Sequence, residues 1–324
     1  MKRFCVYLVL LMLSLSVVIN ISAETAQELQ QRIEELTTII KQDQNNRDAY
    51  FQRGQAYFAL KQYQRAVPNY VRVIELDPEY MPAYRDLALA SISLGDTKNA
   101  FQLLDKALEL APNDGLNYFH RGMLFRKTGQ ASEAVQDFMR SGENFRKGKN
   151  YKDSLQAYTV AIKLAPQEAA AYIARGKVLN LMKNYTDAIQ DFGKAIALDA
   201  AASSAYYNRG ASLYRLEKFA EALRDYTQVT QLKPNDDGGH FNRGLTHVKL
   251  AKPAEAIDDF SAVLALKPDH HWAYYNRAKL YAQLGQNKEA AADYNAYLKL
   301  RAGKDNDAEK IRQKIRDLGF TPEF

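Results

Sequence analysis

Cysteine is almost missing from this sequence of 324 residues, which contains one, Cys5, close to the start of the chain. The chain can form no internal disulfide, so it requires neither an oxidising nor a reducing compartment. Its five histidines form no tight cluster with acidic residues. His240 and His247 are seven residues apart, which is about 10 Å along a helix and too far to share one ion. We therefore expect no metal site and no cofactor.

Catalytic motifs are also missing. The sequence has no nucleophile elbow, no glycine-rich phosphate loop, no HExxH zinc motif and no His-Pro-Asp tripeptide. The formal net charge of +6 comes from 44 basic and 38 acidic residues that are interleaved along the chain. Nucleic-acid binding requires clustered positive charge that neutralises phosphates. We expect neither an enzyme nor a nucleic-acid-binding protein.

A long apolar run occurs once, over residues 4–21, directly after Lys2 and Arg3. The run ends near Ala23, at a sequence typical of a signal-peptide cleavage site. A signal peptide over residues 1–23 predicts an exported protein, either periplasmic or secreted into a lumen. The run of about 18 residues is also at the lower limit for spanning a bilayer. An uncleaved membrane anchor at residues 4–21 is therefore the alternative, and it is the only case in which we expect contact with a membrane.

Repetition is what the sequence has in abundance. The segment YYNRG at 206–210 returns 34 residues later as HFNRG at 240–244, and it occurs earlier as YIARG at 172–176. Such a fixed period is the sequence signature of repeat proteins. Each unit has two amphipathic segments of about 12–14 residues separated by a short polar turn. Small residues recur in register in the two segments, as Gly54 and Ala66, Ala88 and Ala100, Gly122 and Ala134, Gly176 and Ala188, Gly210 and Ala222, Gly244 and Ala256, and Ala278 and Ala290.

These small residues lie where one helix must touch the other, because a larger side chain would push the pair beyond the usual separation of about 8–10 Å. Proline follows the second segment of most units, where it ends the helix, at Pro78, Pro112, Pro166, Pro234 and Pro268. The pattern resembles the tetratricopeptide repeat (TPR) family from residue 47 to about 304. The resemblance implies an all-α fold, a right-handed α-solenoid of helix-turn-helix repeats. It also implies a non-catalytic protein that binds a partner.

A recurring charge pair lies between the two segments. Arginine precedes the first small residue in most units, and aspartate or asparagine follows sixteen residues later, as in Arg209 and Asp225. Two units lack both charges together, with Leu87 and Leu103 in one and Ser141 and Ala157 in the other. Because both members change together, we predict an ion pair between the two helices of one repeat. An anion-binding arginine ladder is the functional alternative.

The repeat spacing breaks once, because Gly122 and Gly176 are 54 residues apart, which is one period plus 20. We predict one long helix over 132–147 that serves two repeats, followed by a helix over 151–164, and two subdomains that meet near 140–150. A basic cluster at 140–152 is interpreted as a solvated face or as a docking patch for an acidic partner or lipid headgroups. After the signal peptide or anchor, we predict an N-terminal capping helix within 24–46 and a first block of three repeats at 47–148. A second block of about five repeats follows at 135–304, and its first repeat shares a helix with the first block. The chain ends in a C-terminal capping helix and tail at 305–324.

The candidate binding residues follow from the resemblance, since the first helices of TPR repeats line a concave surface. Three successive repeats place asparagine one residue before the recurring arginine and an aromatic residue one place earlier. An amide can both donate to and accept from a peptide backbone, and aromatic rings add apolar contact. The candidate site consists of Asn208, Asn242, Asn276, Tyr207, Phe241, Tyr275, Trp272, Arg215, Lys249 and Lys279.

The equivalent residues of the first half, Gln52, Asp86 and His120, share no common chemistry. Ala211 and Leu245 occupy positions where TPR proteins that capture a terminal carboxylate often carry asparagine, which argues against that binding mode. The leading hypothesis is an exported adaptor or scaffold that binds a protein or peptide partner. A chaperone-like holder of unfolded clients and a membrane-anchored structural assembly factor are the alternatives.

Overall fold

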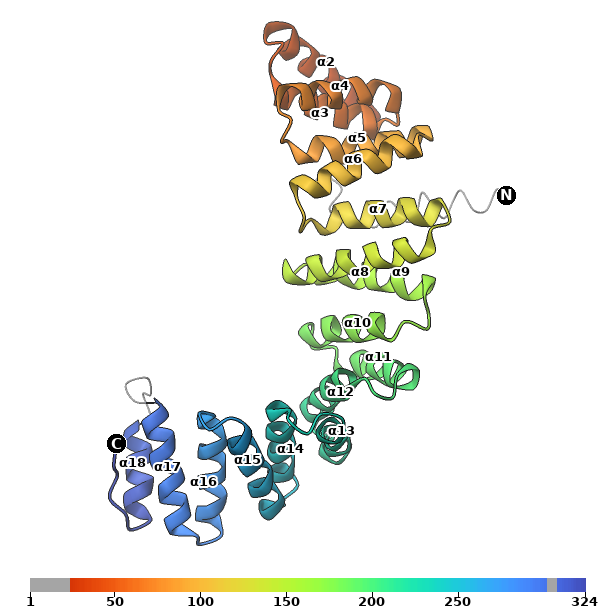
Figure 1. Ribbon diagram of the computed structural model, residues 1–324. Coiled ribbons are helices and arrows are strands. Elements are labelled where there is room, and N and C mark those ends of the chain that lie inside the picture. Colours follow the sequence, from red (N-terminus) through yellow and green to blue (C-terminus); the bar gives the residue numbers. More distant parts are fainter. Residues whose placement is uncertain (1–23, 302–307) are drawn as a thin grey trace. The chain divides into compact units, whose positions relative to one another are not determined.

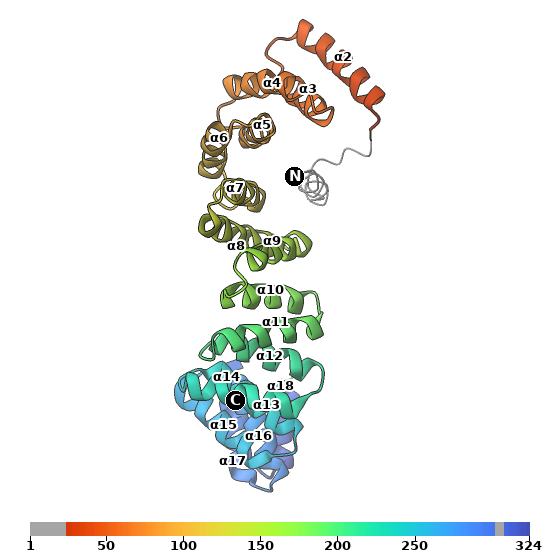
Figure 2. The ribbon, with the colours of Figure 1, turned by 90° about the vertical axis from the view of Figure 1, so that its right-hand side faces the viewer.

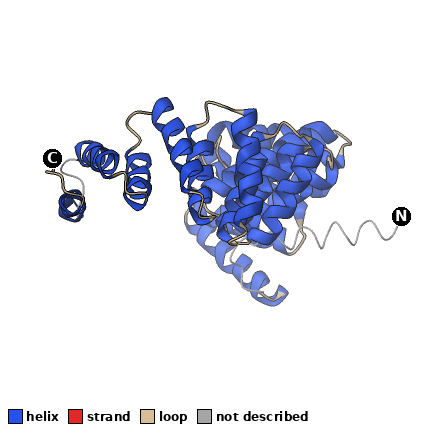
Figure 3. Ribbon diagram, turned by 90° about the horizontal axis from the view of Figure 1, so that it is seen from below, coloured by secondary structure: helices blue, strands red, loops and turns tan. Residues whose placement is uncertain are grey.

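The computed structural model describes residues 24–301 and 308–324, and all secondary structure within these ranges is α-helical (Figures 1 and 3). The predicted signal peptide or anchor at residues 1–23 lies outside the described residues. The described chain divides into two compact units, unit 1 up to Pro166 and unit 2 from Gln167. This division falls later in the chain than the predicted meeting point near 140–150.

Unit 1 stacks eight helices in chain order (Figure 1). After α2, they form antiparallel pairs, with the first and second helices on opposite sides of the stack, as α3 and α5 against α4 and α6 in Figure 2. Their bounds are α2 Ala26–Gln42, α3 Arg47–Ala59, α4 Tyr63–Leu76, α5 Met81–Leu94, α6 Thr97–Leu110, α7 Gly115–Lys127, α8 Ala131–Lys147 and α9 Tyr151–Leu164.

Unit 2 contains four helix pairs and a terminal helix. Each first helix packs against its own second helix, and that second helix packs against the next first helix. The bounds are α10 Ala169–Leu181, α11 Tyr185–Leu198, α12 Ser203–Arg215, α13 Phe219–Leu232, α14 Asp237–Lys249, α15 Pro253–Leu266, α16 His271–Gln283, α17 Asn287–Arg301 and α18 Ala308–Asp317. The all-α solenoid of helix-turn-helix repeats is therefore confirmed.

Close approach of the paired helices depends on the small residues that the period identified. A Cβ added at Gly176 would lie 2.7 Å from the ring of Phe192, which is fully buried on α11. Gly54 faces Tyr70 at the same distance of 2.7 Å. In both of these repeats the ring of the second helix thus occupies the space that a side chain on the first helix would fill, and this contact sets the spacing of the pair.

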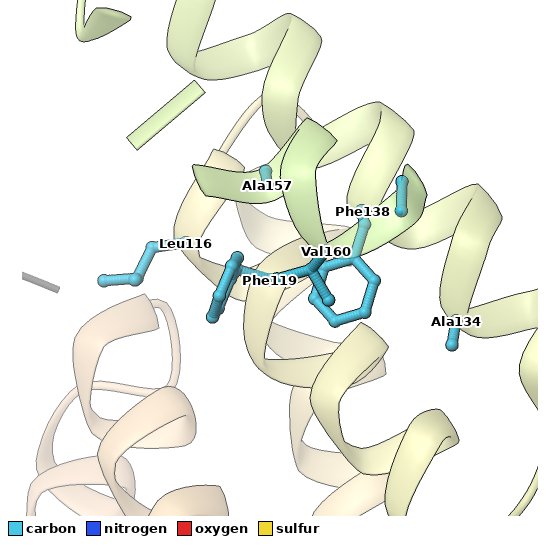
Figure 4. Packing of buried hydrophobic residues seen from close by; sticks show 7 residues of the cluster. Leu116, Phe119, Ala134, Phe138, Ala157 and Val160 are labelled. Carbon is cyan, nitrogen blue, oxygen red and sulfur yellow. The ribbon is translucent and has the colours of Figure 1, made fainter. Parts of the chain in front are cut away.

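The long helix at the break in the period is confirmed. Helix α8 runs from Ala131 to Lys147 and packs against α7 before it and α9 after it. Its early residues Ala134 and Phe138 join Leu116, Phe119, Ala157 and Val160 in one buried cluster (Figure 4). Later along α8, the buried Gly142 contacts the ring of Tyr158 on α9. One helix therefore completes one repeat and begins the next.

A helix lies at each end of the described chain. Helix α2 begins at a capping box between Thr25 and Glu28, and it buries Leu29, Ile33, Leu36 and Ile40 as expected from their spacing. Helix α18 buries Ile311 and Ile315 against the end of α17. The predicted cap of this helix at Asp305 or Asn306 lies outside the described residues.

One prediction about helix length is wrong. Ala200 replaces the proline that follows most second helices, which predicts a helix that continues past this position. Helix α11 instead ends at Leu198 and has 14 residues, the same length as α13, which is followed by Pro234. The backbone N–H of Asp199 donates to the carbonyl of Ala195 as the helix ends, so the turn forms without proline.

Candidate functional site

The first helices of unit 2 lie next to one another. Helix α10 packs directly on α12, and α12 packs directly on α14. Within the described chain, the second helices α11, α13 and α15 show no packing of comparable extent among themselves. A stack whose first helices approach one another in this way curves toward them. The candidate residues on α12 and α14 therefore lie along the inner face of unit 2, and α16 is the next first helix of the stack.

The three asparagines of the candidate site share one orientation. Their Nδ2 atoms donate to the backbone carbonyl four residues earlier, at 2.7 Å from Asn208 to Ser204, 3.0 Å from Asn242 to Gly238 and 2.7 Å from Asn276 to Trp272. A carbonyl oxygen only accepts, so the amide nitrogen of each side chain must face it. Their Oδ1 atoms point away from these carbonyls, and the ladder presents hydrogen-bond acceptors.

Asn242 differs from the other two asparagines because it also joins two helices. Its Nδ2 donates to the hydroxyl of Tyr207 on α12 at 2.8 Å, in addition to the carbonyl of Gly238. Gly238 keeps this contact open, since a Cβ there would lie 3.5 Å from the Tyr207 hydroxyl. Asn242 thus donates two hydrogen bonds inside the protein, whereas Asn208 and Asn276 each donate one, to a carbonyl of their own helix.

The aromatic candidates are half-buried, because each packs against a ring on the second helix of its own repeat. The ring centroids are 6.0 Å apart for Tyr207 and Tyr226 and 5.6 Å apart for Phe241 and Phe260. Burial accordingly raises the pKa of Tyr207. These rings thus contribute to the core, and they offer a ligand only part of their surface.

Trp272 is the most exposed aromatic residue of the candidate set, with 46% of its surface accessible. Its ring lies 5.7 Å from Tyr275 and 5.9 Å from the buried Tyr297, measured between centroids. Lys279 lies next to this group, with Nζ 5.7 Å from the centre of the Tyr275 ring. The structure therefore brings Trp272, Tyr275, Asn276 and Lys279 together on α16.

The two remaining basic candidates lie apart from the asparagines. Arg215 is exposed at the last residue of α12. Lys249 is exposed at the last residue of α14, and its Nζ lies 5.9 Å from the ring of Phe219 on α13. Both charges lie at the edge formed by the turns inside the repeats, so they flank the inner face rather than line it.

The predicted ion pair between the two helices of one repeat is confirmed in five repeats. Arg209 binds both oxygens of Asp225, with Nε to Oδ2 at 2.8 Å and Nη2 to Oδ1 at 2.7 Å. The same two-point contact joins Arg121 to Asp137, Arg175 to Asp191, Arg243 to Asp259 and Arg277 to Asp293. These aspartates are buried, and the pairing raises the pKa of Arg209. The arginines are thus held in the framework.

Several arginines also reach the preceding repeat, which the spacing did not predict. Nη1 of Arg121 binds Asp105 at 2.7 Å, and Nη1 of Arg277 binds Ser261 at 2.8 Å. Asp105 and Ser261 both lie sixteen residues before their arginine. One guanidinium therefore links three helices.

Unit 1 has a buried polar group at the equivalent inner positions. Asp86 on α5 accepts from Arg85 Nε at 3.0 Å and from Gln55 Nε2 at 3.1 Å, and burial raises the pKa of its carboxyl. His120 on α7 is partly buried by surface area, but its Nε2 is enclosed and has no partner. Burial, reinforced by the charge of Arg85, lowers the pKa of His120 to about 3. Sequence spacing carries no signal for this arrangement.

The basic cluster at 140–152 is partly neutralised by its own neighbours. Arg146 donates to both oxygens of Glu143 at 2.8 and 2.7 Å. The guanidinium of Arg140 lies over the ring of Tyr118 at 5.8 Å. This arrangement favours the solvated face over the docking patch.

Metal ligation finds no support in the described part of the chain. Residues 24–301 and 308–324 contain no group of three or more histidine, cysteine, aspartate or glutamate side chains that could hold a metal ion. Within the same ranges, no helix is both long enough and apolar enough to cross a membrane.

Family models match this architecture in several places along the chain. Models described as tetratricopeptide repeat match residues 48–80, 82–114, 203–236 and 241–307, and a TPR repeat model matches 176–217. The chain belongs to the tetratricopeptide repeat family. TPR folds are associated with protein or peptide binding, and they are typically non-catalytic scaffolds.

The chain is similar to proteins of known sequence and of known structure. Over 122 residues the chain is 30% identical to "Heat shock protein STI1" of Saccharomyces cerevisiae, which covers 36% of this chain and 20% of that protein. The aligned part thus spans a fifth of this relative.

Among solved structures, that of MamA has a TM-score of 0.50 at 21% identity and covers 53% of this chain and 94% of MamA. A MamA double mutant has a TM-score of 0.51 at 17% identity, covering 53% and 97%. At these identities the likeness establishes the fold alone.

Proposed function

We propose that this protein is an exported, non-catalytic adaptor that binds a protein or peptide partner on the inner face of unit 2. The observation that carries the proposal is the shared orientation of Asn208, Asn242 and Asn276, whose Oδ1 atoms are turned away from their own helices. Acceptors repeated on three successive first helices match the N–H groups of an extended peptide.

The group on α16 would supply apolar contact at one end of this row. Trp272 is exposed and is supported by Tyr275 and Tyr297, so little side-chain freedom is lost when a ligand packs on it. Lys279 adds a positive charge next to the ring of Tyr275. A partner segment with an apolar residue followed by acidic residues would fit this end of the face.

Export rests on residues 1–23 of the sequence, which resemble a signal peptide. N-terminal sequencing of the protein from its own cells tests this part of the proposal separately. A chain that starts at or near Glu24 would support export and cleavage. A chain that keeps residues 4–21 and fractionates with membranes would support the membrane-anchored assembly factor.

Binding is tested by capture from the envelope or lumenal extract of the same cells, with the tagged chain processed in those cells. The variant carries Asn208→Ala and Asn276→Ala, which removes two acceptors but keeps the link between Asn242 and Tyr207. Gln52→Ala is the matched control, because Gln52 holds the same repeat position in unit 1. We expect a defined partner to be lost from the asparagine variant, with an affinity at least about tenfold lower, and kept by the control.

Two outcomes would contradict the proposed site. If a defined partner binds the asparagine variant as strongly as the unchanged chain, the site lies elsewhere. If many unrelated proteins are captured equally by all three chains, the chaperone-like holder is favoured. Circular dichroism of each variant checks that its helical content is unchanged.

A further inference from the structure

The rings that lie beside the paired arginine differ in one repeat of unit 2. In the last repeat, Tyr274 and Tyr281 lie three residues before and four residues after Arg277, and their rings are 5.9 and 5.6 Å from its guanidinium. In unit 1, Tyr118 and Phe125 flank Arg121 in the same way, at 5.6 and 5.8 Å. In the repeat formed by α14 and α15, both positions carry histidine, His240 and His247.

Both histidines lie against the ion pair of this repeat. Arg243 binds Asp259 through Nε, at 2.9 and 3.1 Å to the two carboxylate oxygens, and through Nη2 at 2.6 Å. His240 Nδ1 is 3.5 Å from Asp259 Oδ1, and His247 Nε2 is 3.7 Å from Oδ2. The Asp259 side chain is 3% exposed, and those of His240 and His247 are 14% and 13% exposed. Four titratable groups therefore share one buried position between α14 and α15.

The two rings offer different surroundings to an added proton, because Nδ1 of His240 faces Asp259 Oδ1 at 3.5 Å, whereas Nδ1 of His247 has no acceptor. His240 Nε2 lies 3.0 Å from the carbonyl of Pro234, which only accepts, so Nε2 carries the hydrogen of this bond. His247 Nδ1 is buried without a partner. A proton added to His247 would therefore place a charged, buried N–H where there is no acceptor, which is costly.

The charges around this position do not compensate for protonation. Arg243 and Asp259 already neutralise each other, so protonating both histidines would place three cations around one carboxylate. Glu255 and Lys252 lie near His247 from the turn into α15 and oppose each other in their effect on it. Burial lowers the pKa of His247, against the opposite influence of Asp259.

The neighbouring helices contribute no further acid at this position. Thr230 of α13 accepts from Arg243 Nη1 at 2.6 Å, and Arg277 of α16 reaches α15 at Ser261. From α12, the hydroxyl of Tyr207 binds Asn242. His270, which precedes α16, lies against Phe241 and accepts from the backbone N–H of Ala273 at 3.1 Å.

We infer that the α14–α15 pair is an acid-sensitive joint, which loosens when His247 binds a proton below a pH of about 6.5. The neighbouring pairs α12–α13 and α16–α17 carry tyrosine or leucine at these two positions, so they stay closed over the same range. Helix α14 also carries Phe241 and Asn242, so acid would weaken ligand binding there. This last consequence rests on the proposed function, whereas the joint itself does not.

The sign of the effect follows from linkage. A histidine whose pKa is lower in the closed pair than in the open pair binds its proton preferentially when the pair is open. Its stabilising contribution is complete above the open-state pKa, near 6.5, and is lost as the pH falls below that value. At pH 5.5, a histidine that stays neutral in the closed pair increases the opening equilibrium about tenfold.

Hydrogen exchange of the free full-length protein at pH 7.5 and 5.5, corrected for the intrinsic exchange rate at each pH, tests the joint without any ligand. We expect protection of α14 and α15 to fall about tenfold at the lower pH, when His247 binds a proton in the open pair. Protection of α12, α13, α17 and the part of α16 beyond its first turn should stay within twofold. An equal fall in all pairs, or a rise in α14 and α15, would overturn the inference.

The matched variant carries His247→Tyr, which copies Tyr281 of the last repeat. It should keep the protection of α14 and α15 unchanged between the two pH values. A variant that retains the acid response of the unchanged chain would also overturn the inference. If the tyrosine variant does not fold, His247→Leu, which copies Leu213 of the preceding repeat, should likewise remove the acid response. These exchange results do not depend on whether a partner binds the asparagines.

Discussion

The two units fill the same position between paired helices in different ways. In unit 2 the four helix pairs that begin with α10, α12, α14 and α16 carry an Arg–Asp pair. In unit 1 the corresponding residues are Arg53 with Asn69, Leu87 with Leu103, Arg121 with Asp137, and Ser141 with Ala157. Ser141 donates to the carbonyl of Gly115 at 2.7 Å instead. The position between two paired helices can thus hold a charged pair, an apolar pair or two small residues.

What the units share is the contact between a small residue and a ring. Gly122 of unit 1 and Gly210 of unit 2 each face the aromatic residue of the second helix, because an added Cβ would lie 3.2 Å from Phe138 and from Tyr226 respectively. The repeat therefore depends on volume at this contact, and the ion pair occupies the space beside it. A buried ion pair can often be exchanged for apolar residues of similar size, whereas losing one partner alone is costly.

Breaking one ion pair should give the largest effect. Asp225→Ala leaves Arg209 half-buried without its carboxylate, and we expect the free energy of unfolding to fall by about 3 kcal/mol. The double change Arg209→Leu and Asp225→Leu copies Leu87 and Leu103 of unit 1, and should cost about 1 kcal/mol or less. Urea denaturation measures both. If the double variant is as unstable as Asp225→Ala, the two units do not share an interchangeable position.

Acid should also lower the free energy of unfolding through His120 of unit 1, by less than the loss of an ion pair does. The pKa of His120 is lowered to about 3 in the folded protein, whereas an unfolded histidine titrates near about 6.5. The unfolded chain binds the proton more tightly, so this contribution is complete above about pH 6.5 and is lost as the pH falls toward 3. Between pH 7 and pH 4.5 we expect a loss on the order of 2 kcal/mol.

The control for His120 comes from unit 2, where asparagine holds the same repeat position. His120→Asn should remove this part of the pH dependence and leave the part due to carboxylates. Urea denaturation at both pH values measures the difference between the two chains. Parallel loss of stability in both chains would show that His120 is not enclosed as described.

The smallest predicted effect on stability concerns position 193, where glycine offers no side chain for a hydrogen bond between repeats. Arg121 and Arg277 each bind a side chain sixteen residues earlier, but Gly193 occupies that position for Arg209, and a Cβ there would lie 3.6 Å from Nη1. Gly193→Ala should stabilise the protein by about 1 kcal/mol through helix propensity. Gly193→Ser should equal or exceed alanine despite its weaker propensity, because its hydroxyl can accept from Nη1. Thermal melting compares the two, and a serine variant less stable than the alanine variant would show that no link forms.

Much of the framework was predictable because a single spacing repeats. The positions of the small residues, the pairing of Arg209 with Asp225 and the long helix α8 all follow from the 34-residue period and its one break. The directions in which the side chains point did not follow from this period. His240 and His247 are two helical turns apart, yet their side chains approach the two oxygens of one carboxylate from either side.

Other features depend on contacts that spacing does not encode. The division after Pro166 follows from how helices pack, not from where the period breaks. The second hydrogen bond of the Asn242 side-chain amide depends on Tyr207, which extends to it from α12. It also depends on the glycine at position 238, which leaves room for this contact. The same residue type in three equivalent positions therefore has two different surroundings.

Helix α8 has a consequence for folding cooperativity. In a linear array, each repeat can fold or unfold with an energy set by itself and its neighbours. Helix α8 belongs to two repeats at once, since α7 needs it as a second helix and α9 needs it as a first helix. Neither repeat can open at this helix without removing the packing surface of the other. The segment from α7 to α9 thus folds and unfolds as one cooperative unit, whereas the other repeats can open separately.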